Sequence, residues 1–146
     1  DDLSRGLGDV YKRQVYEEHG GTKDMKDLTV EDVSPIYKKS YWDRIKGDQL
    51  PSGLDLCVFD FGVNAGTGRA AKYLQNMIGT TPDGGIGPMT LKAVEEYVAK
   101  HGVDGAIKNY QSARQSYYEK LKTFETFGRG WTRRVNETTE SALKMI

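Results

Sequence analysis

The hydrophobic positions of this chain recur with the period of α-helices rather than that of β-strands. Between residues 54 and 65 apolar side chains occupy opposite faces, which predicts a buried central helix. Further stripes predict helices over residues 69–78, from Pro88 to Gly102, from Asp104 to about Leu121, and from about Trp131 onward. No segment alternates with period two for long, so the sequence predicts a mainly α fold.

Glycine, proline and aromatic residues mark the predicted connections. Gly66 and Gly68 predict a tight turn between two helices, with Thr67 as the cap of the second. The Gly-rich loop Asp83–Gly87 is expected to fix a helix–loop–helix shape rather than to perform chemistry. Phe124 and Phe127 are expected in a loop before the last helix.

Composition narrows the class of protein. The 146 residues suit one domain with a small appendage, and 21 basic residues balance 21 acidic ones, which argues against binding nucleic acid or anionic membranes through bulk charge. A single cysteine excludes an intrachain disulfide, and no apolar run resembles a membrane span or a signal peptide. His19 and His101 have no companion at metal-ligand spacing, so we expect no metal and no cofactor.

The amino-terminal residues differ from the rest of the chain. Residues 1–14, DDLSRGLGDVYKRQ, show little apolar periodicity and resemble translated adaptor sequence. We expect them to be foreign or disordered and to carry no chemistry, with an ordinary flexible terminus as the alternative. A helix is then expected to begin near Thr29, or at Ser34 with Pro35 in its first turn, and to close near Trp42.

Asp60 and Asn64 interrupt the apolar surface of the predicted central helix. They stand four positions apart and therefore share one face. Because an unpaired buried carboxylate is costly, Asp60 must be paired or must face a cleft. In the cleft interpretation both residues hold a polar ligand such as a sugar. In the alternative, Asp60 binds an arginine and Asn64 caps the helix before Gly66.

Tyr41 and Trp42 close the preceding helix beside the charged pair Asp43 and Arg44. Aromatic faces stack well on sugar rings, so Tyr41 and Trp42 are candidate substrate-binding residues, together with Asp60 and Asn64. The alternative is that the two aromatic side chains belong to the core.

The basic stretch GRGWTRR, residues 128–134, has two interpretations. It is either a nucleic-acid contact or a capped helix start whose charges lie in solvent. The neutral charge of the chain favours the second. Cys57, on an apolar helix, is expected to be an inert core residue.

Several separate motifs occur in the order of a known family. The runs YWDRIKGDQLPSGLDLCVFDFGVNAGTGRAAKYLQ (residues 41–75), PDGGIGPMTLKAV (82–94) and KTFETFGRGWTRRV (122–135) resemble glycoside hydrolase family 108. The resemblance covers residues 15–146. Members are lysozyme-like peptidoglycan hydrolases of bacteria and phages, some described as secretion activators. It implies a lysozyme-like helical domain with a small helical carboxy-terminal subdomain that resembles a peptidoglycan-binding region.

The resemblance also implies a reaction, cleavage between N-acetylmuramic acid and N-acetylglucosamine with a glutamate as general acid. Such an acid must stay protonated near neutral pH in a poorly solvated cleft. The family's glutamate lies in a Glu-Gly-Gly motif, which this sequence lacks. Glu18 precedes His19 and two glycines and imitates the motif, but the next helix follows almost at once. Glu17 and Glu18 are therefore expected on a helix surface, and the catalytic residue stays unknown.

These observations predict an amino-terminally truncated chain with two parts. Residues 15–79 form a partial lysozyme-like domain, and residues 80–146 form a peptidoglycan-binding-like helical subdomain. We expect a monomeric N-acetylmuramidase of the cell wall whose partner is the peptidoglycan glycan strand. This chain itself is expected to bind weakly at most and to show no turnover. The alternatives are a noncatalytic peptidoglycan-binding module and a helical nucleic-acid binder.

Overall fold

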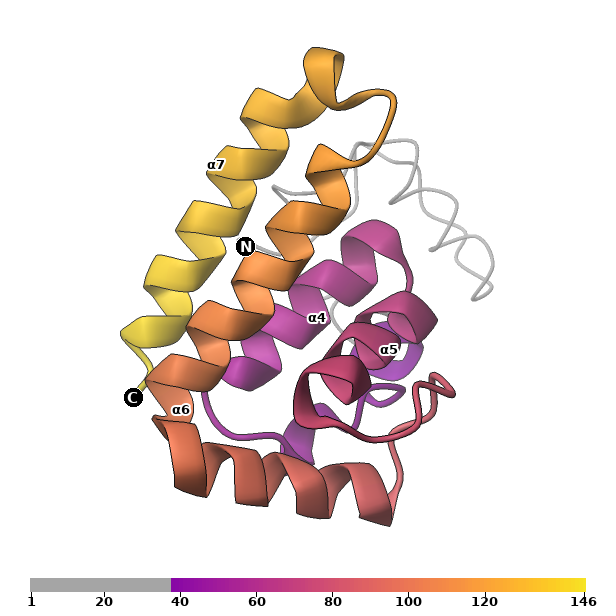
Figure 1. Cartoon of the computed structure of the whole chain (residues 1–146), viewed down its shortest axis with the longest axis vertical. Helices are drawn as coiled ribbons and strands as arrows, with labels where there is room; N and C mark the ends of the chain where they lie inside the picture. Colours follow the sequence, from indigo (N-terminus) through magenta and orange to yellow (C-terminus); the bar gives the residue numbers. More distant parts are fainter. Residues whose placement is uncertain (1–37) are drawn as a thin grey trace, which may run out of the picture.

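A computed structural model describes residues 38–146 of the protein, and these residues fold into packed helices (Figure 1). Two short turns come first, the π-helical η2 (Lys38–Trp42) and the 3₁₀-helical η3 (Gly47–Gln49). Four helices follow: α4 (Leu54–Ala65), α5 (Thr67–Ile78), α6 (Pro88–Glu119) and α7 (Phe124–Leu143). No strand occurs in this part of the chain, and the mainly α prediction is confirmed.

Some predictions fall on residues that lie outside the described part. They are the foreign segment 1–14, the surface placement of Glu17 and Glu18, and the start of the helix near Thr29 or Ser34.

Helix α4 is the buried centre of the fold, as its two apolar faces predicted. The other three helices all pack against it. Cys57 and Phe61 have no exposed surface, and the Phe61 ring meets a group of tyrosines at centroid distances of 5.4 to 6.2 Å. This group consists of Tyr73, Tyr110, Tyr117 and Tyr118. Burial of large aromatic rings supplies much of the stability of such a core.

The connection between α4 and α5 is shorter than the sequence suggested. Gly66 alone joins the two helices, at a φ of 104° that side chains rarely adopt. Gly68 lies inside the first turn of α5 instead of the connection, so its predicted role was wrong. Thr67 begins α5 and makes no side-chain capping bond, so the predicted cap was wrong as well. With Gly66 itself in the cap position, the helix starts one residue earlier.

Gln75 holds the Gly-rich loop that follows α5. This side chain is 1% exposed, and its Nε2 donates to Asp83 Oδ1 and the Gly85 carbonyl, both at 2.9 Å, and lies 3.2 Å from Thr90 Oγ1. Its Oε1 accepts from the Gly84 N–H at 2.9 Å. One amide therefore ties α5 to the loop and to the first turn of α6. The loop has the shape-fixing role that the sequence predicted.

Helix α6 contains a sharp elbow where the sequence predicted two separate helices. Gly102, with φ 79° and ψ 158°, is non-helical, and the helix axis changes direction there (Figure 1). The Asn109 amide donates to the Tyr97 hydroxyl at 2.7 Å and so links the two arms. The first arm closes the end of the bundle near α5, and the second lies alongside α7 (Figure 1).

Helix α7 begins at Phe124, not at about Trp131 as predicted. Phe124 and Phe127 are therefore helical, and both rings approach Trp131, with centroid distances of 6.5 and 5.7 Å. Gly128 sits directly below the Phe124 ring, where a Cβ would come within 2.7 Å of it. Gly128 thus makes room for aromatic packing along one face of the helix.

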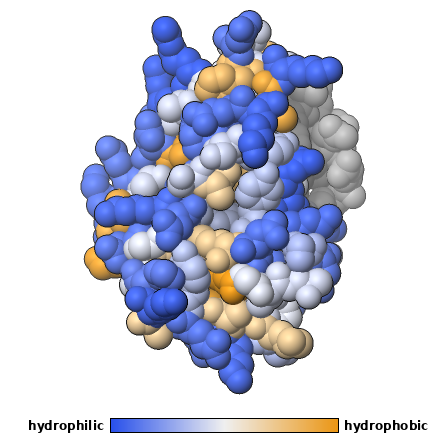
Figure 2. Space-filling model, viewed as in Figure 1, coloured by the Kyte–Doolittle hydropathy of each residue, from blue (hydrophilic) through white to orange (hydrophobic). Residues whose placement is uncertain are grey.

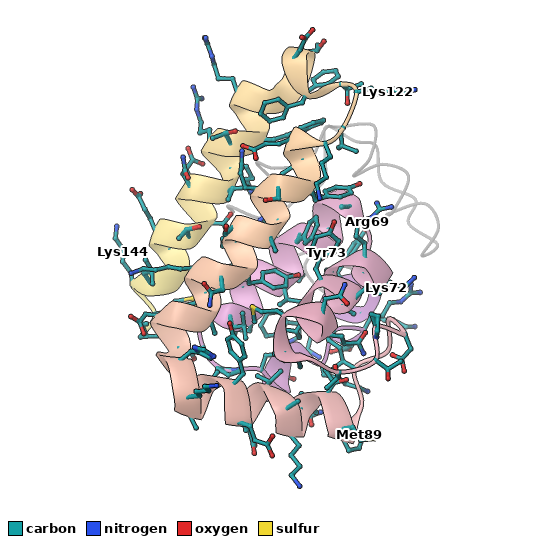
Figure 3. All side chains as sticks on the ribbon, viewed as in Figure 1. Arg69, Lys72, Tyr73, Met89, Lys122 and Lys144 are labelled. Carbon is teal, nitrogen blue, oxygen red and sulfur yellow. The ribbon has the colours of Figure 1, made fainter. Side chains whose placement is uncertain are left out.

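The face shown in Figure 2 is largely hydrophilic, with small scattered apolar areas. Among residues 38–146, the strongly exposed apolar side chains are Met89, at the start of α6 (Figure 3), Phe127, Met145 and Ile146. The helices described here are not apolar over a length that would span a membrane.

Candidate functional site

A cavity of about 1040 Å³ opens between α4, the start of α5, the end of α6 and α7. Its walls combine aromatic, cationic and amide side chains with a few apolar ones. The residues that line it are Leu56, Asp60, Val63, Asn64, Ala65, Gly66, Arg69, Tyr117, Tyr118, Leu121, Gly130, Trp131, Arg133, Arg134, Glu137, Thr138 and Ser141. We call this cavity the cleft.

Asp60 lies at the base of the cleft and is 3% exposed. Its Oδ2 accepts from Arg114 Nη2 at 2.7 Å, and its Oδ1 accepts from Arg134 Nε at 3.0 Å. The Thr138 hydroxyl lies 3.2 Å from Oδ2, and the Asn64 amide lies 3.4 Å from the same atom. One carboxylate of α4 is therefore bound by side chains from α6 and α7. We call this group the Asp60 network.

The network keeps Asp60 ionised. Burial alone would raise the pKa of the carboxyl group, but attraction to Arg114 and hydrogen bonds from Arg134 outweigh it, so the pKa lies below its ordinary value. The Arg114 guanidinium, in turn, would have its pKa lowered by burial, but Asp60 raises it. Both groups are charged at neutral pH, and neither is suited to donate a proton there.

Arg114 is fully buried in an aromatic setting. Its guanidinium carbon lies 5.4 Å from the Phe61 ring centroid and 5.5 Å from that of Tyr118. Its Nε donates to the Tyr118 hydroxyl at 3.2 Å, while Nη1 has no hydrogen-bond partner within residues 38–146. The sequence offered a signal for this residue, because Arg114 follows Tyr110 by four positions and so shares its buried face.

Arg69 lines the cleft together with three aromatic residues, Tyr117, Tyr118 and Trp131. The Arg69 guanidinium lies 4.8 Å from the Tyr117 ring centroid, and its Nη1 donates to the Ala65 carbonyl at 3.2 Å. Across the cleft, the Trp131 ring stacks on Tyr118 with a centroid distance of 5.2 Å. Figure 3 shows Arg69 on the edge of α5 nearer the end of α6 than Lys72 is. Sequence reasoning missed this arrangement.

The four candidate residues fall into two places. Asp60 and Asn64 line the cleft, whereas Tyr41 and Trp42 are not among its lining residues. The Trp42 ring meets Phe59 edge-on at 5.6 Å, and its Nε1 donates to Asp48 Oδ1 at 2.8 Å. Tyr41 and Trp42 both pack against the hydrophobic core. This packing agrees with the core alternative, and substrate binding by these two residues stays a prediction.

The alternatives for the other two residues can also be compared with the geometry. Asp60 pairs with arginines, as its structural alternative stated, yet it also borders the cleft. Asn64 is exposed in the last turn of α4 and donates to Asp60. Neither observation tests ligand binding, which stays a prediction for both.

The three arginines of the basic stretch 128–134 lie in two environments, solvent and the Asp60 network. Arg129 and Arg133 are exposed, as expected for charges in solvent. Arg134 is not, because its guanidinium binds the carboxylate of Asp60. The expectation that all three charges lie in solvent was therefore wrong for Arg134. No group of three or more His, Cys, Asp or Glu side chains that could hold a metal ion occurs in the part of the chain that the structure describes.

Two family models match the chain on either side of the connection between α4 and α5. The model described as Glycosyl hydrolase 108 matches residues 8–66, and the model described as Predicted Peptidoglycan domain matches residues 69–136. A solved structure titled "Structure of Brucella abortus SagA" is 35% identical, with a TM-score of 0.80 over 96% of this chain and 78% of that chain. No curated protein matches.

The helical fold and the two matched regions define a lysozyme-like protein with a function related to peptidoglycan. The chain belongs to the glycosyl hydrolase 108 family and carries that family's peptidoglycan-binding region. The resemblance inferred from the motifs is thereby confirmed. The cleft lies where the two regions meet, since α4 belongs to the first and α6 to the second.

Proposed function

We propose that this protein is an N-acetylmuramidase-type peptidoglycan hydrolase that holds the cell-wall glycan strand in the cleft. The observation that carries the proposal is the cleft itself, a cavity of about 1040 Å³ walled by both matched regions. Pockets for small molecules usually occupy roughly 300–1,000 Å³. A site at the top of that range, open and polar, suits an oligosaccharide better than a single compact ligand.

The side chains of the cleft supply the contacts that sugars use. Trp131 and Tyr117 line the cleft with apolar ring atoms, against which a sugar can pack. The Asn64 amide and the guanidinium groups of Arg69 and Arg133 offer hydrogen-bond donors for hydroxyl and N-acetyl oxygens. This wall leads us to expect measurable binding, where the sequence alone led us to expect weak binding at most.

The catalytic acid of the proposed reaction is not assigned. A general acid must be protonated at working pH, and Asp60 has the opposite property because its pKa is lowered. The other carboxylate that lines the cleft from residues 38–146 is Glu137, which is exposed. The second candidate function is a noncatalytic module that binds peptidoglycan for a partner enzyme, and the observation that favours it is that the family's Glu-Gly-Gly motif does not occur in this sequence.

Cosedimentation with purified, insoluble peptidoglycan tests binding in the cleft. The chain has two tryptophans, which allows a matched pair of variants. Trp131→Phe alters the cleft, whereas Trp42→Phe alters an aromatic residue outside it. We expect the Trp131 variant to lose most of the bound fraction and the Trp42 variant to keep it. The reverse pattern places the site at Trp42, and failure of the unaltered chain to sediment with peptidoglycan refutes the proposal.

Release of reducing ends from the same peptidoglycan distinguishes the enzyme from the module. Turnover by the unaltered chain that Glu137→Gln abolishes assigns the acid to Glu137. Turnover that survives this substitution places the acid elsewhere in the chain. Binding without turnover favours the module.

Three further features belong to the proposal. We propose that the chain acts as a monomer at the cell wall of bacteria or phage-infected cells. We keep the division into residues 15–79 and 80–146 as a proposed domain boundary. Roles in phage lysis, wall remodelling or secretion are equally compatible with a glycan-binding cleft.

A further inference from the structure

Within residues 38–146, the charged groups at the cleft are mostly cations, although the chain as a whole has no net charge. In the Asp60 network two guanidinium groups share one carboxylate, which leaves one positive charge unbalanced at the base of the cleft. Arg69 and Arg133 add two more cations to its walls, and Glu137 contributes one anion. The local excess of positive charge is therefore a property of this surface and not of the overall composition.

In the part of the chain that the structure describes, the two wall arginines lack an acidic partner, and Arg69 is in addition fixed by neighbouring groups. Within residues 38–146, neither Arg69 nor Arg133 forms an ion pair, so both charges are free to bind a ligand. Arg69 is also held in place by the Tyr117 ring and the Ala65 carbonyl. A guanidinium group that is fixed before binding loses little side-chain entropy when it takes up a carboxylate in bidentate geometry.

Peptidoglycan carries carboxylates close to its sugars. Its sugar backbone is uncharged where the lactyl group of N-acetylmuramic acid is joined to a peptide, and the free carboxylates lie on that peptide. A neutral glycan alone would give no reason for an unbalanced cluster of cations beside sugar-binding aromatic rings. The charge excess therefore calls for a ligand that carries both a sugar ring and a nearby carboxylate.

We propose that Arg69 and Arg133 recognise a free carboxylate of the peptide stem, so that the cleft prefers peptide-bearing glycan over bare glycan. This inference rests on the proposed function, because it names the part of peptidoglycan that the same cleft reads. Trp131 and Tyr117 then contact the sugar, while the two arginines contact the peptide. The ion pair between Asp60 and Arg134 holds α7 against α4 and so positions Arg133, the next residue on α7.

Calorimetric titration with three soluble probes tests this assignment. The probes are a disaccharide tetrapeptide released from peptidoglycan, the same muropeptide with its carboxyl groups converted to amides, and a neutral hexamer of N-acetylglucosamine. We expect the unaltered chain to bind the first probe about tenfold more tightly than the second, since a charge-assisted bidentate contact is of this size. Arg133→Gln and Arg69→Gln should each remove most of this difference.

Arg129→Gln is the matched control, because Arg129 lies one turn before Arg133 on α7, is exposed and does not line the cleft. It should leave the tenfold preference intact. Since all three arginines are exposed, unchanged circular dichroism and thermal unfolding are expected for each variant. A preference that Arg129→Gln reduces as much as Arg133→Gln overturns the proposal, because general surface charge then explains it.

The remaining outcomes separate this inference from the proposed function. Equal affinity for all three probes overturns carboxylate recognition and leaves glycan binding in place. No binding of any probe, together with no cosedimentation with peptidoglycan, refutes both. Tighter binding to a short DNA duplex than to the muropeptide, lost in Arg133→Gln, overturns the inference in favour of phosphate recognition.

Discussion

Two buried polar centres connect distant parts of this protein, and they differ in whether the centre as a whole keeps a charge. Gln75 on α5 is a neutral amide whose donors and acceptor are all used within the loop and the first turn of α6. Asp60 on α4 is a charged group bound by two arginines, so the centre keeps a positive charge and borders the cleft. The first centre is complete in itself, whereas the second has charge available for a ligand.

This difference in charge suggests a structural role for Gln75 and a functional role for Asp60. Both side chains are almost fully buried, so burial alone does not distinguish them. What distinguishes them is charge balance and access to a cavity, since a satisfied neutral network gains nothing from a ligand. Four variants or conditions test this contrast, from the largest effect to the smallest.

Asp60→Asn should have the largest effect. The substitution leaves Arg114 and Arg134 facing an amide, and removal of one partner from a buried ion pair costs about 3–5 kcal/mol. Urea unfolding followed by circular dichroism measures the loss. The control is Asp43→Asn, which removes an exposed pair with Lys38 at 3.0 Å and should change the stability far less, because solvent screens such a pair. Equal urea midpoints for the two variants would contradict the role given to Asp60.

Protonation of Asp60 by acid should have the next largest effect. The pKa of Asp60 is lower in the folded chain than in the unfolded chain, so its charge stabilises the fold fully above the unfolded pKa. That stability is lost as the pH falls through the folded pKa, which places the loss below about pH 4. The free energy of unfolding, measured with urea at several pH values in this range, should fall more steeply with decreasing pH in the unaltered chain than in Asp60→Asn. A residual slope is expected, because hydrogen bonds from the Gly85 N–H and Gln75 also lower the pKa of Asp83.

Gln75→Leu should have a smaller effect, and one confined to the neutral centre. It leaves the Gly84 N–H and the Thr90 hydroxyl without their partner, at about 2 kcal/mol. The Asp83 carboxylate also loses its bond from Gln75, but it is exposed and can bind water instead, so it adds little to the lost stability. Hydrogen exchange of the Gly84 amide should accelerate in this variant and remain slow in Asn76→Leu, a substitution at the exposed neighbouring position. Loss of muropeptide binding in Gln75→Leu would remove the contrast between the two centres.

Thr138→Val should have the smallest effect, about 1 kcal/mol, because it keeps the shape of the side chain and removes one neutral hydroxyl, which donates to the Arg134 carbonyl at 2.8 Å and lies 3.2 Å from Asp60 Oδ2. Thr139→Val removes a comparable hydroxyl that contacts the Val135 carbonyl and Gln111 and does not contact Asp60. The two variants should differ below pH 4, where only Thr138→Val alters the environment of the titrating carboxylate. Identical acid unfolding would show that Thr138 is not part of the network.

Local patterns were sufficient for most of the fold. The two apolar faces of residues 54–65 identified the central helix, and Gly102 marked the elbow of α6. The start of α7 was missed because the sequence does not show that the Phe124 ring packs over Gly128. This contact exists only once the helix has formed, and the spacing of apolar residues in the sequence does not reveal it.

The site was only partly accessible from the sequence. Asp60 stood out as a carboxylate on an apolar helix, and Gln75 carried a comparable signal because it follows Ala71 by four positions on a buried face. Arg69 and Arg133 carried no such signal, since both are exposed and lie far apart in the chain. Both line the cleft because α5 and α7 each pack against α4, which is a property of the tertiary structure.

The buried thiol of Cys57 gives the protein an internal reporter of its own opening. Burial at the centre of α4 raises the pKa of this thiol to about 12, and its side chain has no exposed surface. Because the thiolate is the reactive form, a maleimide or disulfide reagent should not modify the folded chain. Any modification then records a moment when the bundle comes apart around α4. The rate of labelling thus counts opening events in the unmodified protein, without an introduced probe.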